Sequence, residues 1–418
     1  QQQKPNIIFI LIDDMGWTDL GCYGSTYYET PNIDKLAARS LRFTQAYAAC
    51  PVSSPTRASI LTGKYPVKTD VTDWIPGRQN AIGPEKHNKL MCLPFAQQLA
   101  LEEVTIAEEL KSAGYKTASI GKWHLGDSAF FPQHQGFDTN IGGYNRGGPY
   151  GGKGYFYPFG APGVEGKEGD FLTNNLTDQV IKFIERNKDK PFFIYFPNYA
   201  VHNPVMAPDT TIERFEAKTR MLGNKDDARF DTDPFWAKRF PEKMRKNFIE
   251  RKLQDKADYA ALIANLDQNV GRLVEKLKEL GLDKNTIIIF TSDNGGLSTS
   301  EGSNTCNVPL KAGKGWMYEG GTRVPAFIFA PGIIPQGRVS DEIITSVDYF
   351  PTILELAGVK QTATGTDGIS LLSLMKGGKL PERPIFWHYP HYSNQGGTGP
   401  YSAVRLGDYK LIEFHEDM

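Results

Sequence analysis

Four short apolar runs without polar alternation constrain this chain more than any other feature. They span residues 6–12, 191–196, 286–291 and 325–330. A strand with continuous apolar sequence is buried on both faces, as in a parallel sheet covered by helices. Helical patterns lie between the runs, at residues 105–113, 172–187, 258–280 and 348–357. We therefore expect an α/β fold with a large, mostly parallel sheet sandwiched by helices.

The pattern changes after Leu374, where a Gly-Gly-Lys-Leu-Pro stretch interrupts it. Short strand-like runs follow at residues 384–389 and 409–414. We expect a large N-terminal domain, residues 1–375, and the beginning of a smaller C-terminal domain on an antiparallel sheet, residues 376–418. This second segment is expected to continue if the chain belongs to a longer parent protein.

Charge and hydropathy exclude several kinds of partner. Lys and Arg total 47 against 48 Asp and Glu, a net charge of -1, so no global field recruits nucleic acid or an acidic membrane. No apolar run approaches the roughly 20 residues of a transmembrane segment. The start at Gln1 predicts a processed, periplasmic or secreted chain whose signal peptide has been removed. Residues 237–256 alternate basic and acidic residues and are expected to form a solvated helix face.

Polar residues follow the predicted strands where each one ends. They are Asp13 and Asp14, Lys122 and His124 after a strand at residues 116–120, His202, and Asp293 with Asn294. Loops from separate strands converge beyond the carboxyl ends of an open parallel sheet, which is where ligands bind. The sequence therefore predicts one site at this edge.

The stretch of residues 53–63 reads as the start of a helix. Ser54 is expected to cap the helix, Pro55 suits its first position, and the free N–H groups favour an anion nearby. Asp13, Asp14 and the pair at 293–294 offer oxygen ligands without histidine or thiolate, which favours calcium or magnesium over zinc. The four cysteines form no Cys-x-x-Cys pair, so a zinc or redox site is weakly supported.

Residues 53–63 resemble the signature of the type I sulfatases: Cys or Ser, any residue, Pro, a small residue, Arg, and a later Leu-Thr-Gly. Ser53 occupies the modified position, because reading from Cys50 would put Val52 in place of Pro and Ser54 in place of Arg. Ser53 is either native, as in serine-type members, or an engineered replacement of Cys. The family belongs to the alkaline phosphatase superfamily.

The resemblance extends to Gly121-Lys122-Trp123-His124, Asp-Asp after the first strand and Asp-Asn-Gly-Gly after a later one. It implies that a maturase oxidises Ser53 to formylglycine, whose hydrated aldehyde attacks sulfur, and that Ca²⁺ binds Asp13, Asp14, Asp293 and Asn294. It also implies roles for five further residues. Arg57, Lys122 and Lys314 stabilise the sulfate, His124 regenerates the aldehyde, and His202 protonates the leaving alcohol.

Aromatic and polar residues near the motifs are candidates for substrate binding. They are Trp74, Arg78, His388, His391, Tyr392 and Asn394. Such groups stack on sugars and hydrogen-bond to them, although each is equally compatible with packing. Bacterial members with a similar segment act on sulfated glycans, so the expected substrate is a sulfated saccharide.

Two other functions stay open. A phosphatase or phosphodiesterase of the same superfamily is compatible with the fold, but a two-zinc site calls for more histidines near the carboxylates than this sequence offers. A non-catalytic binder of sulfated polymers, with Ser53 unmodified, is the second alternative.

Overall fold

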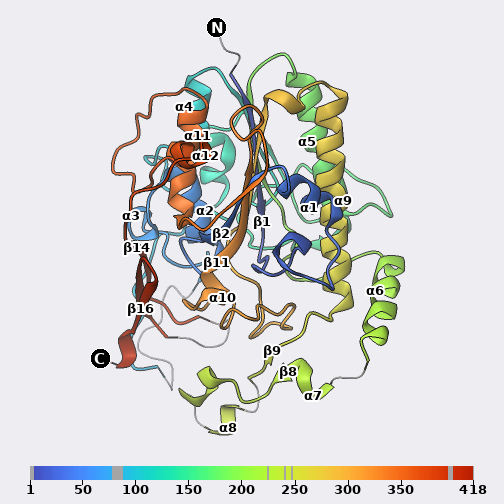
Figure 1. Ribbon diagram of the computed structural model, residues 1–418, viewed down its shortest axis with the longest axis vertical. Helices are drawn as coiled ribbons and strands as arrows, with labels where there is room; N and C mark the ends of the chain where they lie inside the picture. Colours follow the sequence, from blue (N-terminus) through green and yellow to red (C-terminus); the bar gives the residue numbers. More distant parts are fainter. Residues whose placement is uncertain are drawn as a thin grey trace.

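The computed structural model describes residues 4–77, 88–223, 226–239, 242–245, 248–393 and 399–417. A nine-stranded sheet runs through the molecule between helices (Figure 1). Its strands are β1 (Asn6–Ile12), β2 (Leu41–Tyr47), β3 (Lys116–Ile120), β4 (Thr139–Ile141), β7 (Phe192–Pro197), β10 (Thr286–Ser292), β11 (Arg323–Phe329), β12 (Arg338–Ser340) and β13 (Ile344–Thr345). The order is β12-β2-β11-β10-β1-β7-β3-β4, and β13 also pairs with β2.

The sheet is parallel from β10 through β1, β7 and β3 to β4, whereas β11 is antiparallel to both of its neighbours. The prediction of a large, mostly parallel sheet is confirmed. The run at residues 325–330 forms a buried strand, as predicted, but this strand runs antiparallel to both of its neighbours. An apolar run in the sequence does not reveal strand direction, because parallel and antiparallel strands are both apolar when they are buried at the centre of a sheet.

Helices cover both faces of the sheet. On one face lie α1 (Pro31–Ala37), α5 (Leu172–Asn187) and α9 (Ala257–Glu279), and on the other α2 (Ser53–Thr62), α4 (Ile106–Ser112), α11 (Tyr349–Leu356) and α12 (Leu372–Met375) (Figure 1). Side chains of β1 alternate between the layers: Ile8, Ile10 and Ile12 pack with α5 and α9, and Ile7, Phe9 and Leu11 with α2, α4 and α11. This double burial is why the strand lacks polar alternation.

The remaining helices lie outside these layers. They are α3 (Pro66–Thr69), α6 (Asp209–Met221), α7 (Asp226–Arg229), α8 (Glu242–Arg245) and α10 (Glu319–Thr322). Small two-stranded sheets join β5 (Gly152–Lys153) to β6 (Phe156–Phe159) and β8 (Phe230–Asp231) to β9 (Glu250–Arg251). Of the described helices, none combines the length and apolar character that crossing a membrane requires.

The expectation of one solvated helix over residues 237–256 is wrong. Its described residues form the end of a 3₁₀ turn, the short helix α8 and the strand β9. Glu250 and Arg251 in β9 are 3% and 7% exposed. Arg251 donates to the Ser303 carbonyl and pairs with Asp255, so tertiary partners override the helical charge pattern.

The C-terminal segment forms a three-stranded antiparallel sheet, as predicted. It consists of β14 (Ile385–Tyr389), β15 (Tyr401–Leu406) and β16 (Tyr409–Phe414). One face packs against the segment that precedes α2, through Tyr47, Cys50 and Val52. Trp387 Nε1 donates a 2.8 Å hydrogen bond to the Ala48 carbonyl. The domain boundary at residue 375 stays a prediction.

Candidate active site

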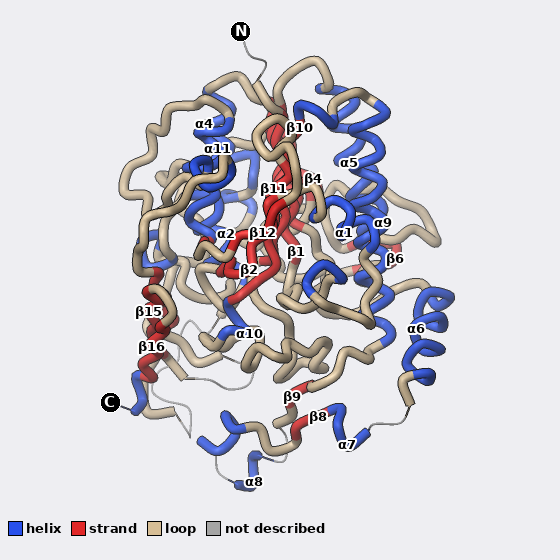
Figure 2. The backbone as a smooth tube through the Cα atoms, in the orientation of Figure 1, coloured by secondary structure: helices blue, strands red, loops and turns tan. Residues whose placement is uncertain are grey.

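The polar residues that follow the strands meet at one edge of the sheet, where loops gather beyond the strands in Figure 2. Backbone hydrogen bonds continue the strand pairing into this edge. Asp13 N donates to Ala200 O at 3.0 Å, and Asp293 N to Ile12 O at 3.1 Å. Lys122 N donates to Pro197 O at 2.7 Å. The ends of β1, β3, β7 and β10 are therefore fixed relative to one another.

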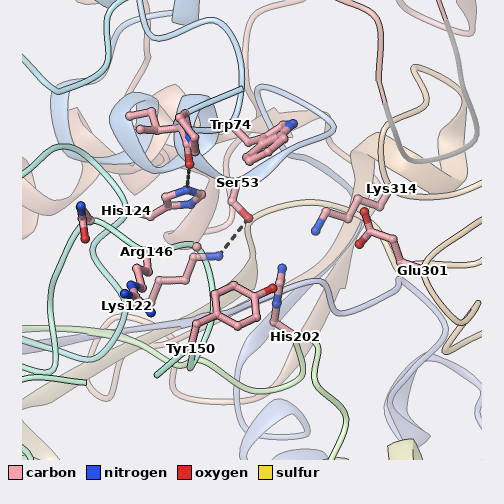
Figure 3. Close-up of a pocket in the computed structure, with 13 residues that line it drawn as sticks. Ser53, Trp74, Lys122, His124, Arg146, Tyr150, His202, Glu301 and Lys314 are labelled. Atoms are coloured by element: carbon pink, nitrogen blue, oxygen red, sulfur yellow. Dashed lines mark hydrogen bonds between the residues drawn. The ribbon is translucent and has the colours of Figure 1, made fainter. Parts of the chain in front are cut away.

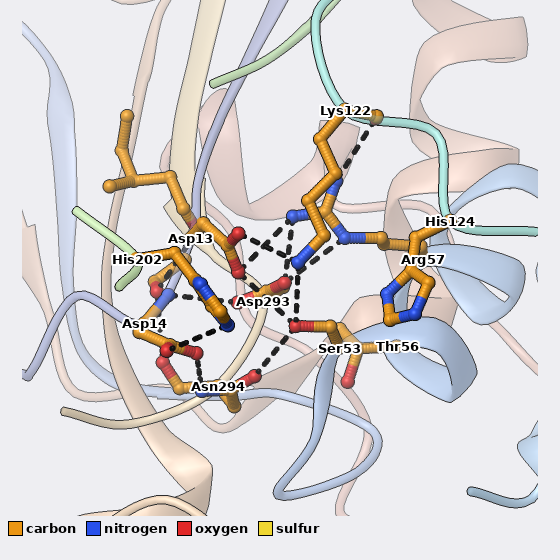
Figure 4. A network of polar contacts seen from close by, with 12 residues as sticks. Asp13, Asp14, Ser53, Thr56, Arg57, Lys122, His124, His202, Asp293 and Asn294 are labelled. Atoms are coloured by element: carbon orange, nitrogen blue, oxygen red, sulfur yellow. Dashed lines mark hydrogen bonds and ion pairs between the residues drawn. The ribbon is translucent and has the colours of Figure 1, made fainter. Parts of the chain in front are cut away.

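Three buried ion pairs form the floor of the site, and Figure 4 shows the two that involve Lys122 and Arg57. Lys122 Nζ lies 2.7 Å from Asp13 Oδ2, and Arg57 Nη2 lies 2.8 Å from Asp293 Oδ2. Behind them, Lys314 Nζ lies 2.8 Å from Asp14 Oδ2. The side chains of the first two pairs are fully buried. Three cations thus balance three buried carboxylates, and burial strengthens their interactions.

Ser53 lies at the centre of this network. Its Oγ is 3.2 Å from Asp13 Oδ1 and 3.4 Å from Asn294 Oδ1, and it accepts a hydrogen bond from Lys122 Nζ at 3.3 Å. Ser53 is the first residue of α2 and is 3% exposed. The N–H groups of the first helical turn therefore favour negative charge at this position.

The prediction that Ser54 caps α2 is wrong. The N-cap is Val52, which has no side-chain capping bond. Ser54 Oγ instead donates to the His124 carbonyl at 3.0 Å and accepts from Ile75 N at 3.1 Å. Its hydroxyl therefore ties together two segments that line the site.

The rings of His124 and His202 are oriented by backbone carbonyls. The Ile75 carbonyl accepts from His124 Nε2, and the Asn203 carbonyl accepts from His202 Nδ1 at 2.7 Å. His124 Nδ1 therefore keeps its lone pair, and it is buried without a hydrogen-bond partner in the described structure. His202 Nε2 faces Asp14 Oδ2 at 3.7 Å.

Burial also keeps both rings neutral. It lowers the pKa of His124 well below its usual range, helped by Lys122. Burial lowers the pKa of His202 to about 3, although Asp14 opposes this shift. An anionic group arriving in the pocket would favour the protonated form of His202.

The carboxylates fit a hard divalent cation. Asp14 N donates to Asp293 Oδ1 at 3.2 Å, and Asn294 Nδ2 to Asp14 Oδ1 at 2.9 Å, so three of the four predicted ligands contact one another. Asp13 joins them through Ser53 Oγ, which contacts both Asp13 and Asn294. Asp13, Asp14 and His202 each offer a ligand atom within 4.8 Å of the others. Burial raises the pKa of Asp13 to about 8 against the attraction of Lys122, and Asp293 and Asp14 add to the rise. These buried carboxylates, with His202 beside them, could hold a divalent metal ion.

A cavity of about 430 Å³ opens above Ser53 (Figure 3). Six residues that the sequence predicted line it: Ser53, Trp74, Lys122, His124, His202 and Lys314. Arg57 and the four predicted metal ligands lie beneath these residues rather than on the wall. Arg57 is fully buried against Asp293, so it contacts the carboxylates of the floor and does not line the cavity.

Sequence reasoning missed four polar residues of the cavity wall: Asn145, Arg146, Tyr150 and Glu301. Three of them lie in a loop dense in glycine. Gly147 allows this loop to pass His124, because an added Cβ would lie 2.7 Å from the imidazole ring. The density of glycine in this loop was the sequence feature that indicated a close approach of its backbone to another part of the chain.

The other predicted substrate-binding residues lie elsewhere. His391 is buried and bonds Thr72 through Nε2 at 2.8 Å, and His388 bonds Ser402 through Nδ1 at 2.7 Å. Tyr392 accepts from Leu90 N at 2.9 Å and contacts Glu416. None of the three is among the described lining residues. Arg78 and Asn394 are outside the described residues.

His391 is expected to make stability depend on pH. It is 2% exposed, and burial lowers its pKa to about 4, with His388 adding to the shift. Because this value is below the unfolded pKa of about 6.5, the unfolded chain binds more protons and stability falls as the pH drops from 7 to 5. We expect a loss of about 2 kcal/mol from this group, measured by urea unfolding. His391→Gln should remove that slope, and parallel pH profiles for both proteins would contradict the assignment.

Comparison with known proteins supports this geometry. A family model described as Sulfatase matches residues 5–359, and one described as N-sulphoglucosamine sulphohydrolase, C-terminal, matches residues 312–418. The N-acetylgalactosamine-6-sulfatase of Canis lupus familiaris is 33% identical over 428 residues, covering 98% of this chain and 71% of the relative. The chain belongs to the sulfatase family. It is therefore a sulfuric ester hydrolase, as the sequence predicted.

Further sulfatase comparisons agree. Arylsulfatase A of Homo sapiens is 32% identical over 445 residues, covering 99% of this sulfatase and 75% of the relative. Ps i-CgsB in complex with k-i-k-neocarrahexaose superposes with a TM-score of 0.76 at 30% identity, covering 99% of this chain and 85% of that one. A structure in complex with its substrate D-glucosamine-2-N,6-O-disulfate gives a TM-score of 0.70 at 27% identity, covering 100% and 90%. The fold is that of the alkaline phosphatase superfamily.

Proposed function

We propose that this sulfatase removes sulfate from a sulfated carbohydrate, with an oxidised Ser53 and a bound Ca²⁺ ion. The observation that carries the proposal is the position of Ser53. It lies at the start of α2, at the base of a cavity and among three buried pairs of carboxylate and cation. Such a site favours a negatively charged group near residue 53 and supplies cations for its oxygen atoms.

These residues fit a divalent cation and an oxidised form of residue 53. Asp13, Asp14, Asp293 and Asn294 would hold Ca²⁺, which supplies positive charge beside residue 53. Oxidised by a maturase to formylglycine and hydrated, residue 53 would supply a hydroxyl nucleophile. In the described structure the Ser53 hydroxyl contacts Asp13, Asn294 and Lys122 and no imidazole, so an unmodified serine here lacks the histidine base that commonly activates a serine nucleophile.

The chain's own residues perform the remaining steps. Lys122 and Lys314 bind the sulfuryl oxygens at the cavity wall, and Arg57 holds Asp293 in place behind them. His202 binds the leaving oxygen and gives it a proton once the anionic substrate has raised the pKa of the ring. His124 takes up a proton at Nδ1, the nitrogen that has no other partner.

Several features support a saccharide as substrate. Trp74 and Tyr150 on the cavity wall offer aromatic faces, and Asn145 a hydrogen-bonding amide. One relative is named N-acetylgalactosamine-6-sulfatase, and two of the compared structures hold saccharides. A periplasmic or secreted location stays a prediction.

Parallel assays test the reaction class. Purified protein, coexpressed with a formylglycine-generating maturase, is supplied with 4-nitrophenyl sulfate and 4-nitrophenyl phosphate. We expect sulfate release to dominate by at least about 100-fold. Dominant phosphate release would favour the phosphatase alternative. If the protein binds sulfated saccharides but hydrolyses neither ester, it is a non-catalytic binder.

Removal of metal is expected to lower both stability and turnover. EDTA should reduce the Tm, and addition of CaCl₂ at about 100 times its Kd should restore about 2.7 kcal/mol of stability. MgCl₂ should restore less, because Mg²⁺ prefers to keep several waters. The variant Asp14→Ala lacks one predicted ligand, so its Tm should not rise when CaCl₂ is added. Equal Tm values with and without Ca²⁺ in the unaltered protein would rule out the proposed site.

A further inference from the structure

One cation of the cavity wall is not used by the proposed reaction. Lys122 and Lys314 are each paired with a carboxylate of the floor. Arg146 also lines the cavity, but it is exposed, and within the described part of the chain no carboxylate lies at ion-pair distance from it. It is therefore available to an anion that enters the cavity beside the scissile sulfate.

The loop that carries Arg146 is held in place by hydrogen bonds. Tyr144, which is 8% exposed, donates through its hydroxyl to Gly148 O at 3.1 Å and Tyr150 O at 2.7 Å. The carbonyl of Tyr144 accepts from His124 N at 3.0 Å. The loop is thus closed on itself and attached to the catalytic edge, so the backbone that carries Arg146 has a fixed position at the rim.

Charge is distributed unevenly around the cavity. In Figure 3, Arg146 lies on the same side of Ser53 as Lys122, whereas Glu301 lies on the other side with Lys314. Both residues line the cavity there, and Lys314 is already paired with Asp14, so the carboxylate of Glu301 makes this side less favourable for an anion. A second anion would be repelled by Glu301 and attracted by Arg146, whereas hydroxyl or amino groups suit the side of Glu301.

We propose that Arg146 is a specificity-determining residue that binds a second anionic group, sulfate or carboxylate, on the substrate. The planar guanidinium offers a pair of N–H donors that matches both groups. The inference rests on the proposed function and narrows its substrate class to saccharides with at least two anionic groups. Monosulfated saccharides would occupy the site above Ser53 but would leave Arg146 without a partner.

Competition assays test this proposal. D-glucosamine 6-sulfate, D-glucosamine 2-N,6-O-disulfate and an unsaturated chondroitin 6-sulfate disaccharide, which carries a carboxylate, compete with 4-nitrophenyl sulfate for the matured enzyme. We expect at least one of the two dianions to bind about five- to tenfold more tightly than the monosulfate. The two dianions distinguish sulfate from carboxylate as the second group.

Variants assign the preference to Arg146. Arg146→Ala should abolish it, so that the three saccharides compete with 4-nitrophenyl sulfate equally well, and Arg146→Lys should restore part of it. The control Arg220→Ala removes an exposed cation of α6 that does not line the cavity and should keep the preference. Equal binding of all three saccharides, or a preference that persists in Arg146→Ala, would overturn the proposal.

Failure of the proposed function would look different. If the matured enzyme released no sulfate from any ester, the proposed function would fail, and calorimetric titration with the same saccharides would still test Arg146. If 4-nitrophenyl sulfate is hydrolysed but the dianions bind no better than the monosulfate, only the inference about Arg146 fails.

Discussion

Replacement of Ser53 by alanine is expected to lower sulfate ester turnover by at least about 10³-fold without unfolding the protein. The substitution removes the Oγ atom, which contacts Asp13, Asn294 and Lys122 and is the atom to be oxidised. Initial rates with 4-nitrophenyl sulfate measure the loss, and the Tm reports on folding.

Ser59→Ala is the matched control in the same helix. Ser59 is fully buried in α2, and its Oγ has no hydrogen-bond partner in the described structure. Its removal should leave turnover near that of the unaltered enzyme. If Ser53→Ala retained more than about a tenth of the original rate, Ser53 would not be the source of the nucleophile.

Asp293→Ala is expected to lower the free energy of unfolding by about 3–5 kcal/mol, because it leaves the buried Arg57 guanidinium without its closest partner, with Asp13 Oδ1 at 3.6 Å as the carboxylate that remains. Asp293 Oδ2 accepts from Arg57 Nε at 3.1 Å and Nη2 at 2.8 Å, and both side chains are fully buried. The substitution also removes a predicted metal ligand, so turnover should disappear. Chemical unfolding with and without Ca²⁺ measures the stability effect.

An exposed aspartate provides the comparison for this variant. Asp178 pairs with Arg272 between α5 and α9, but its side chain is 46% exposed. Water screens such a pair, so Asp178→Ala should change stability by less than about 1 kcal/mol. Similar losses for the two variants would show that Asp293 and Arg57 do not form the strong pair that the geometry implies.

The strands and the residues at their ends were predictable because both depend on the local sequence pattern. Continuous apolar sequence identified β1, β7 and β10, and the convergence of parallel strand ends brought Asp13, Lys122 and Asp293 to one edge. The motif resemblance placed Ser53 among them. Whether each residue has its predicted catalytic role stays a prediction.

The cavity wall was not predictable, because its positions depend on contacts between distant segments. Arg146 owes its place to the hydrogen bonds of Tyr144, and Glu301 has a positive φ of 51° in a loop without regular structure. Ser54 looks like a helix cap in sequence, yet its hydroxyl bonds Ile75 and His124. Arg57 was expected to help stabilise the sulfate, which stays a prediction, and the spacing of the motifs did not reveal that it lies fully buried behind Asp293.

The most direct test compares turnover with the fraction of Ser53 that has been oxidised. Preparations coexpressed with increasing amounts of maturase are analysed by peptide mass spectrometry, where conversion removes two hydrogen atoms from residue 53, and are assayed with 4-nitrophenyl sulfate. The proposed chemistry predicts that turnover rises in proportion to the converted fraction and extrapolates to zero when Ser53 is unmodified. Full activity in unconverted protein, or a fully converted protein that releases no sulfate, would contradict it.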